Sequence, residues 1–158
     1  MKNGELHTLI DLLERSCLKF PENAYLWEKR EGGYRSVTYR QTRREVGDVA
    51  AGLLAGGLQK GDRVALLSEG CNDWVFAELG ILYAGGVNVP LSIKLTDKEL
   101  IFRVRHSGAR FLIVSDYYVA TLRRIEAELP EIEKIYVIRY SSAEEGKYNS
   151  FERLKDEG

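Results

Sequence analysis

The sequence has 158 residues, a formal net charge of -1, 44% hydrophobic residues and 30% charged residues. That length fits one domain with a sizeable core, and the near-neutral charge gives no reason to expect a nucleic-acid partner. Cys17 and Cys71 are isolated, no Cys/His cluster has metal-ligand spacing, and the longest apolar run, residues 75–89, is interrupted and short for a membrane span. With no signal peptide, we expect a cytoplasmic chain with reduced thiols and no transmembrane segment.

The first forty residues predict a helix and then a β-hairpin. Apolar side chains recur at helical spacing over residues 6–19, so an amphipathic helix should end before Pro21, with His7 solvated in its first turn. Residues 24–29 and 34–38 flank a Glu-Gly-Gly segment, which is typical of a hairpin with a glycine turn.

A long helix is predicted after the hairpin. Thr38 is followed three residues later by Gln41, which is the signature of a capping box. Apolar residues then form a stripe from Val46 to Leu54, and Gly56-Gly57 should end the helix.

Residues 61–90 predict a β-α-β unit, and the same pattern continues to residue 139. Strand candidates start near residues 63, 87, 110 and 134, in steps of 24, 23 and 24 residues, with one helical segment in each gap. The first of these helices is apolar on nearly every side, so it should be enclosed. This spacing predicts an α/β fold with an open, mostly parallel sheet and helices on both faces, preceded by the helix and the hairpin.

The two later helices carry recognisable start signals. One begins at Thr96, with Glu99 three residues later, and stops at Ser107-Gly108. The next should be capped by Ser115 or Asp116 and end before a proline.

Apolar periodicity collapses after Arg139. Residues 140–149 are polar and turn-rich, and residues 150–155 could start a short helix with nothing left to pack against. We therefore expect a domain over residues 1–139 and a polar tail over residues 140–158 that leads toward a missing remainder.

Ligands of open α/β sheets usually bind at the carboxyl ends of the strands. Here those ends read Ser68-Glu69-Gly70, Pro90-Leu91-Ser92 and Ser115-Asp116, without the glycine spacing of a dinucleotide fingerprint or a GxxxxGK[ST] loop. GxSxG and HExxH are also missing, and His106 has no identifiable partner. From the residues alone we predict a fold, with no catalytic residue and no metal ligand.

Several segments, in order along the chain, carry a resemblance to a known family: Phe20-Pro21-Glu22-Asn23-Ala24, Val37-Thr38-Tyr39, Gly61-Asp62-Arg63-Val64-Ala65, Trp74, Ala84-Gly85-Gly86-Val87-Asn88-Val89-Pro90-Leu91, Leu95-Thr96 with Glu99-Leu100, and His106-Ser107-Gly108-Ala109. Together they make residues 6–139 look like the N-terminal region of the adenylate-forming (AMP-binding) enzymes, most like a long-chain fatty acyl-CoA synthetase, that is, a fatty acid–CoA ligase. One departure is that Ser68-Glu69 is followed by Gly-Cys-Asn-Asp-Trp where long-chain members often read Asn-Arg-Pro-Glu-Trp. This difference concerns the loop and leaves Cys71 as a small, buried or half-buried residue.

The resemblance implies a parent enzyme with a two-step reaction. A fatty acid carboxylate attacks the α-phosphate of ATP to give an acyl-adenylate and pyrophosphate, and coenzyme A (CoA) then displaces AMP. The family supplies the phosphate loop, the ligands that support Mg²⁺ and ATP, and the catalytic lysine from segments that this sequence does not contain. It should therefore be an N-terminal fragment that binds no cofactor and has no synthetase activity by itself.

The resemblance also singles out Lys94. In some relatives a basic residue at this place, after the Pro-Leu strand end, contacts a CoA phosphate, and a helix start at Thr96 would favour an anion there. An exposed loop lysine is the alternative interpretation.

Two other functional classes remain open. The chain could be a stand-alone binding or assembly module with the same fold, or a small flavodoxin-like or receiver-like protein, although the phosphate loop or acidic cluster of the latter folds is missing. If the parent's elements normally cover part of the sheet, the exposed apolar surface predicts a homo-oligomer.

Overall fold

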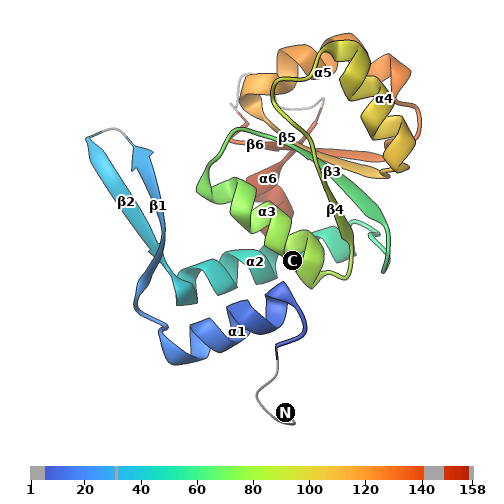
Figure 1. Cartoon of the computed structure of the whole chain (residues 1–158). Coiled ribbons are helices and arrows are strands. Elements are labelled where there is room, and N and C mark those ends of the chain that lie inside the picture. The colour runs from blue at the N-terminus through green and yellow to red at the C-terminus, as the bar shows by residue number, and fades with distance from the viewer. Residues whose placement is uncertain (1–5, 31, 141–147, 157–158) are drawn as a thin grey trace.

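The computed structural model describes residues 6–30, 32–140 and 148–156, and Figure 1 shows how their elements are arranged. A helix and a hairpin come first, and a long helix leads into alternating strands and helices. In chain order the elements are α1 (Leu9–Lys19), β1 (Ala24–Arg30), β2 (Gly33–Thr38), α2 (Tyr39–Ala55), β3 (Arg63–Leu67), α3 (Asn72–Tyr83), β4 (Val87–Pro90), α4 (Asp97–Ser107), β5 (Phe111–Ser115), η1 (Asp116–Tyr118), α5 (Val119–Ile125), η2 (Glu126–Glu128), β6 (Lys134–Ile138), β7 (Asn149–Ser150) and α6 (Phe151–Asp156).

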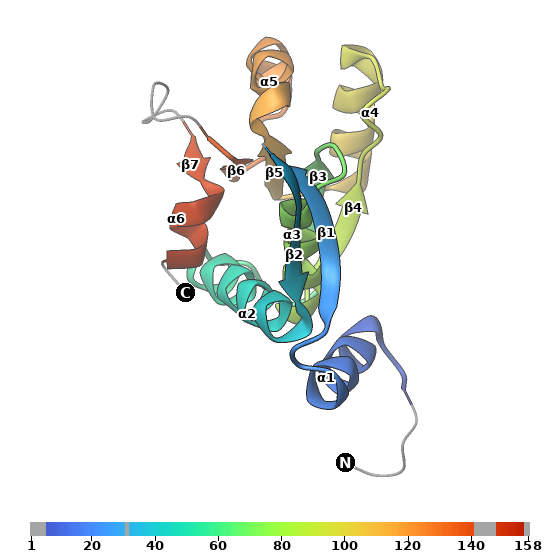
Figure 2. The ribbon, with the colours of Figure 1, turned by 90° about the vertical axis from the view of Figure 1, so that its left-hand side faces the viewer.

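The five strands from β3 to β7 form one parallel sheet in the order β4-β3-β5-β6-β7. α2, α3 and α6 cover one face, α4 and α5 cover the other, and α1 packs beneath α2 (Figures 1 and 2). The predicted α/β class, with helices on both faces of a parallel sheet, is confirmed.

Two hydrophobic cores lie on opposite faces of this sheet. Successive side chains of a strand point to opposite faces, so Val64 and Leu66 join the core with α2, α3 and α6, whereas Ala65 and Leu67 join the core with α4 and α5. A strand with both faces covered reads as a continuous apolar run, which is why the interior strands β3, β5 and β6 could be placed from the sequence.

The helix α3 is enclosed at its centre, where it packs closely against α2. A Cβ atom on Gly80 would lie 2.4 Å from Cγ1 of Val49, so only glycine allows the two helices to approach this closely. The enclosure is incomplete at the end of α3, because Tyr83 is exposed.

The helix starts predicted at Thr38 and Thr96 are confirmed by capping boxes, and a third capping box, which was not predicted, lies at Thr8. The side chains of Thr8, Thr38 and Thr96 each accept a hydrogen bond from the backbone N–H of the residue three positions later. The side chain of that later residue in turn accepts a hydrogen bond from the backbone N–H of the threonine. His7 was expected inside the first helical turn, but it precedes the N-cap Thr8 and lies outside the helix. Gly108 ends α4 with a φ of 65°, a left-handed conformation that suits glycine.

The segment after β5 differs from the single helix that was predicted. It comprises the 3-10 turn η1, the short helix α5 and the 3-10 turn η2. Neither Ser115 nor Asp116 caps a helix with its side chain, because the Ser115 hydroxyl donates instead to the Glu69 carboxylate. Tertiary bonding therefore outweighs the local capping signal.

The chain beyond Arg139 does find something to pack against, so that expectation was wrong. β7 extends the sheet beside β6, and α6 docks on α2 with Phe151 and Leu154 at most 1% exposed. A Cβ atom on Gly52 of α2 would lie 1.9 Å from the Leu154 carbonyl oxygen, so glycine makes room for α6. Residues 141–147 of the predicted polar segment, and Glu31 of the predicted hairpin turn, lie outside the described residues.

The antiparallel hairpin of β1 and β2 projects from the body of the molecule (Figure 1). Trp27 pairs with Ser36 and Lys29 pairs with Tyr34, so these four side chains share one face of the hairpin. Leu26 and Val37 lie on the other face and pack against the core. The predicted hairpin is confirmed.

Candidate functional site

The order of the strands identifies one edge of the sheet as the place to look for a site. After β3 the chain moves to β4 on one side, then crosses back to β5 on the other side of β3. In open α/β sheets, ligands bind outside the carboxyl ends of the strands where the order reverses. Here that point lies between the ends of β3 and β5, where Ser68-Glu69 and Ser115-Asp116 follow the strands.

A hydrogen bond between two side chains links the strand ends at this point. The Ser115 hydroxyl, whose residue is 1% exposed, donates to Oε2 of Glu69 at 2.6 Å. The Ser68 hydroxyl donates to the Glu69 carbonyl at 2.9 Å. A carboxylate therefore occupies the position where a phosphate-binding sheet would offer backbone amides, so this edge suits a hydroxyl or a cation better than a phosphate.

Tyr118 lies near the same carboxylate. Burial, with a smaller contribution from the negative charge of Glu69, raises the pKa of the Tyr118 phenol. The phenol therefore stays protonated at neutral pH and acts as a neutral hydrogen-bonding group.

Cys71 stands at the N-cap position of α3, and its Sγ atom lies 3.8 Å from the Ser68 hydroxyl. Burial is the main cause that raises the pKa of this thiol. A thiol with a raised pKa is a weak nucleophile at neutral pH, because the thiolate is the reactive form. The half-buried, structural role predicted for Cys71 agrees with this geometry.

Arg139 forms an ion-pair bridge next to the switch point. Its Nε atom lies 3.0 Å from Oδ2 of Asp73 at the start of α3, and its guanidinium also contacts Oε1 of Glu28 on the hairpin at 2.5 Å. Its backbone adopts a left-handed φ of 59°. Sequence reasoning missed this bridge, because Arg139 and Glu28 are 111 positions apart and no local motif connects them.

Lys94 lies on the exposed turn between β4 and α4, after the carboxyl end of β4, which pairs with β3. The next helix begins close by, but its first turn already contains two carboxylates. Glu99 accepts hydrogen bonds from Thr96, and Asp97 pairs with Arg124 of α5 at 2.8 Å. These acidic groups offset the positive end of the helix dipole that was expected to favour an anion beside Lys94.

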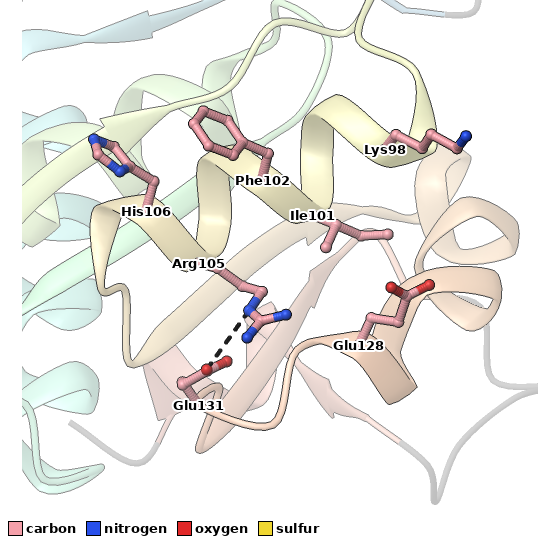
Figure 3. Close-up of a pocket in the computed structure, with 7 residues that line it drawn as sticks. All are labelled: Lys98, Ile101, Phe102, Arg105, His106, Glu128 and Glu131. Atoms are coloured by element: carbon pink, nitrogen blue, oxygen red, sulfur yellow. Dashed lines mark ion pairs between the residues drawn. The ribbon is translucent and has the colours of Figure 1, made fainter.

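A separate hollow of about 620 Å³ runs along α4, and we call it the α4 groove (Figure 3). His106, which had no partner in the sequence, stacks on Phe102 there, with ring centroids 5.4 Å apart and planes 11° apart. Arg105 lies 3.7 Å from Glu131 across the groove. The groove is lined by Lys98, Ile101, Phe102, Arg105, His106, Glu128 and Glu131.

Over residues 6–30, 32–140 and 148–156, no group of three or more His, Cys, Asp or Glu side chains is placed to hold a metal ion. Among the helices in this described part, none has both the length and the apolar character needed to cross a membrane.

Comparison with known proteins adds to this geometry. Residues 13–157 match the family model described as AMP-binding enzyme. The crotonobetaine/carnitine–CoA ligase of Citrobacter koseri is 28% identical over 137 residues, which cover 86% of this chain and 26% of that protein. The chain thus spans about a quarter of the length of this curated relative.

Solved structures of CoA ligases share the fold. An anthranilate CoA ligase in complex with anthranoyl-AMP matches with a TM-score of 0.86 and 28% identity, over 99% of this chain and 30% of that one. A long-chain-fatty-acid–CoA ligase from Archaeoglobus fulgidus matches with a TM-score of 0.79 and 18% identity, over 94% of this chain and 29% of that one, and this likeness shows the fold alone. Because the family model covers nearly the whole chain, we conclude that the chain belongs to the AMP-binding enzyme family.

Proposed function

We propose that the chain is the N-terminal scaffold of a cytoplasmic long-chain fatty acid–CoA ligase. The complete enzyme would convert a fatty acid, ATP and CoA into acyl-CoA, AMP and pyrophosphate through an acyl-adenylate. The observation that carries this proposal is the match to an anthranoyl-AMP-bound CoA ligase over 99% of the chain. The preference for long-chain acids rests on the sequence resemblance, since the relatives named above act on carnitine, anthranilate and fatty acids.

The residues of the chain support a structural role in that reaction. The switch point between β3 and β5 is linked by the Ser115–Glu69 hydrogen bond, and a carboxylate there would repel the phosphates of ATP. We therefore infer that ATP and Mg²⁺ are bound by segments of the ligase outside this sequence. Such chemistry needs donors and cations aimed at the developing negative charge.

The acid class can be tested in the complete ligase that contains these residues. Pyrophosphate release would be followed with saturated fatty acids of increasing length, with benzoate and anthranilate as matched aromatic acids. The proposal predicts the highest kcat/KM for a long-chain acid. A higher value for an aromatic acid would reject the long-chain assignment while leaving the family membership intact.

We further propose that Lys94 contacts a phosphate of CoA in the complete enzyme. Its place on an exposed turn leaves the ammonium group accessible to a ligand, although the neighbouring Asp97 and Glu99 weaken the local attraction for anions. A Lys94→Ala variant should raise the KM for CoA by about tenfold or more with little change in the KM for ATP, since a hydrogen bond to a charged group contributes about 1.5–3 kcal/mol and about 1.4 kcal/mol is a factor of ten.

The matched control is Lys29→Ala, which removes an exposed lysine from the hairpin. This variant should leave both KM values unchanged. If Lys94→Ala also leaves the affinity for CoA unchanged in a direct titration, Lys94 is simply an exposed loop residue.

A further inference from the structure

The α4 groove presents an unusual combination of exposed side chains. Phe102 is 65% exposed although it is a large aromatic residue, and it is stacked on His106 above the half-buried Ile101. Exposed aromatic groups rimmed by polar residues are typical of surfaces that bind another protein. Figure 3 shows that the other lining residues of this groove are all charged.

These charges are arranged in two rows of opposite sign. Lys98 and Arg105 lie on the α4 side, whereas Glu128, at the end of η2, and Glu131, in the turn before β6, lie on the other side. Lys98 and Glu128 mark one end of the groove, and Arg105 and Glu131 mark the other end (Figure 3). The rows therefore run side by side along the groove.

This arrangement is self-complementary about a two-fold axis that runs along the groove. Rotation about that axis places the basic row of one copy opposite the acidic row of the other copy. Lys98 of each copy then faces Glu128 of the other, and Arg105 faces Glu131, which is the reciprocal pattern of an isologous interface. We propose that a second copy of this chain docks on the α4 groove in this way, with Ile101, which lies between the two rows, near the axis and Phe102 on the outer side of the basic row.

Other occupants fit this surface less well. An anionic ligand such as a nucleotide would meet Glu128 and Glu131 as well as the cations. An apolar ligand would cover four charged side chains without offering any of them a partner. Within one copy, Arg105 and Glu131 are 3.7 Å apart and each side chain is more than half exposed, so this contact is weak and available to pair with a second copy.

The proposal predicts a salt-sensitive dimer, and sedimentation equilibrium can measure its dissociation constant. In the proposed dimer, Lys98→Glu places two negative charges opposite each other at both contacts between positions 98 and 128, and Glu128→Lys places two positive charges there. Each variant alone should therefore raise the dissociation constant by at least about tenfold. An equimolar mixture of the two variants should restore association, because both contacts then pair opposite charges in the mixed dimer.

The control is Lys29→Glu, which makes the same charge change on the hairpin and should leave association unchanged. Circular dichroism and urea unfolding establish that each variant is folded. Loss of the dimer at high salt is also expected, because exposed ion pairs are screened.

Two results would overturn the proposal. One is a wild-type chain that stays monomeric at millimolar concentration in low salt. The other is a dimer that is insensitive to both charge variants, strengthens with salt and is lost in a Leu9→Ser/Leu18→Ser variant. That result would place self-association on the exposed apolar residues of α1.

Discussion

Two glycines of the helix α2 give opposite predictions for the same substitution. Gly47 and Gly52 both lie inside α2, so replacing either with alanine should gain about 1 kcal/mol from helix propensity. A Cβ atom on Gly47 would meet nothing within 4 Å, whereas a Cβ atom on Gly52 would lie 1.9 Å from the carbonyl oxygen of Leu154. Only the second substitution therefore disturbs the docking of α6.

The size of the effect at Gly52 follows from what α6 buries. Overpacking of a well-packed site costs about 1–3 kcal/mol, and contact with a backbone atom leaves little room for relief by a rotamer change. Complete undocking of α6 would expose Phe151 and Leu154, at roughly 1.5–3 kcal/mol each. We expect Gly52→Ala to lower the free energy of unfolding by about 2 kcal/mol or more, and Gly47→Ala to raise it by about 0.5–1 kcal/mol.

Urea unfolding followed by circular dichroism measures both free energies. Hydrogen exchange of the amides in residues 149–156 shows whether α6 loosens in the Gly52→Ala variant. If Gly52→Ala is as stable as Gly47→Ala, α6 does not dock on α2 as described, and the fold ends before β7.

Two further predictions concern charged groups. Arg139→Gln should lower the free energy of unfolding by about 1–3 kcal/mol, because it leaves the buried Asp73 carboxylate without its cation. The same variant should speed hydrogen exchange in the hairpin, which Arg139 holds through Glu28. Unchanged exchange in the hairpin would contradict the bridge. The Arg124 guanidinium lowers the pKa of Asp97, so this pair contributes stability that is present above the ordinary carboxyl pKa and is lost as the pH falls through the lower, folded-state value. The urea concentration at the unfolding midpoint should therefore decrease as the pH is lowered below about 4. In the Asp97→Asn variant this decrease with pH should be shallower, and a decrease as steep as that of the wild type would contradict the assignment.

The sequence predicted the β-α-β units well because burial on both faces leaves a strong local signal. Each of the interior strands β3, β5 and β6 is a short apolar run, and glycines or capping boxes mark several of the adjoining turns. The parts that were missed depend on distant contacts. The α5 segment is broken because Ser115 bonds to Glu69 in preference to capping a helix, and α6 is buried because Gly52 on α2 makes room for it.

The candidate site was predicted less completely for the same reason. The strand ends and Lys94 could be named from their positions in the chain, but the Arg139 bridge joins three separate elements. The α4 groove likewise combines one face of α4 with the turn that precedes β6. In the sequence, Phe102 is one more apolar residue of an amphipathic helix, and only the packing of α4 shows that it faces outward.

The most direct test of the central claim is pyrophosphate release by the 158-residue chain itself. The chain would be supplied with ATP, Mg²⁺, CoA and a panel of fatty and aromatic acids. Because its strand ends hold a serine–carboxylate pair in place of a phosphate loop, we predict no release above that of a sample without protein. Acid-dependent turnover by the chain alone would contradict the account and place catalytic groups among the residues described here.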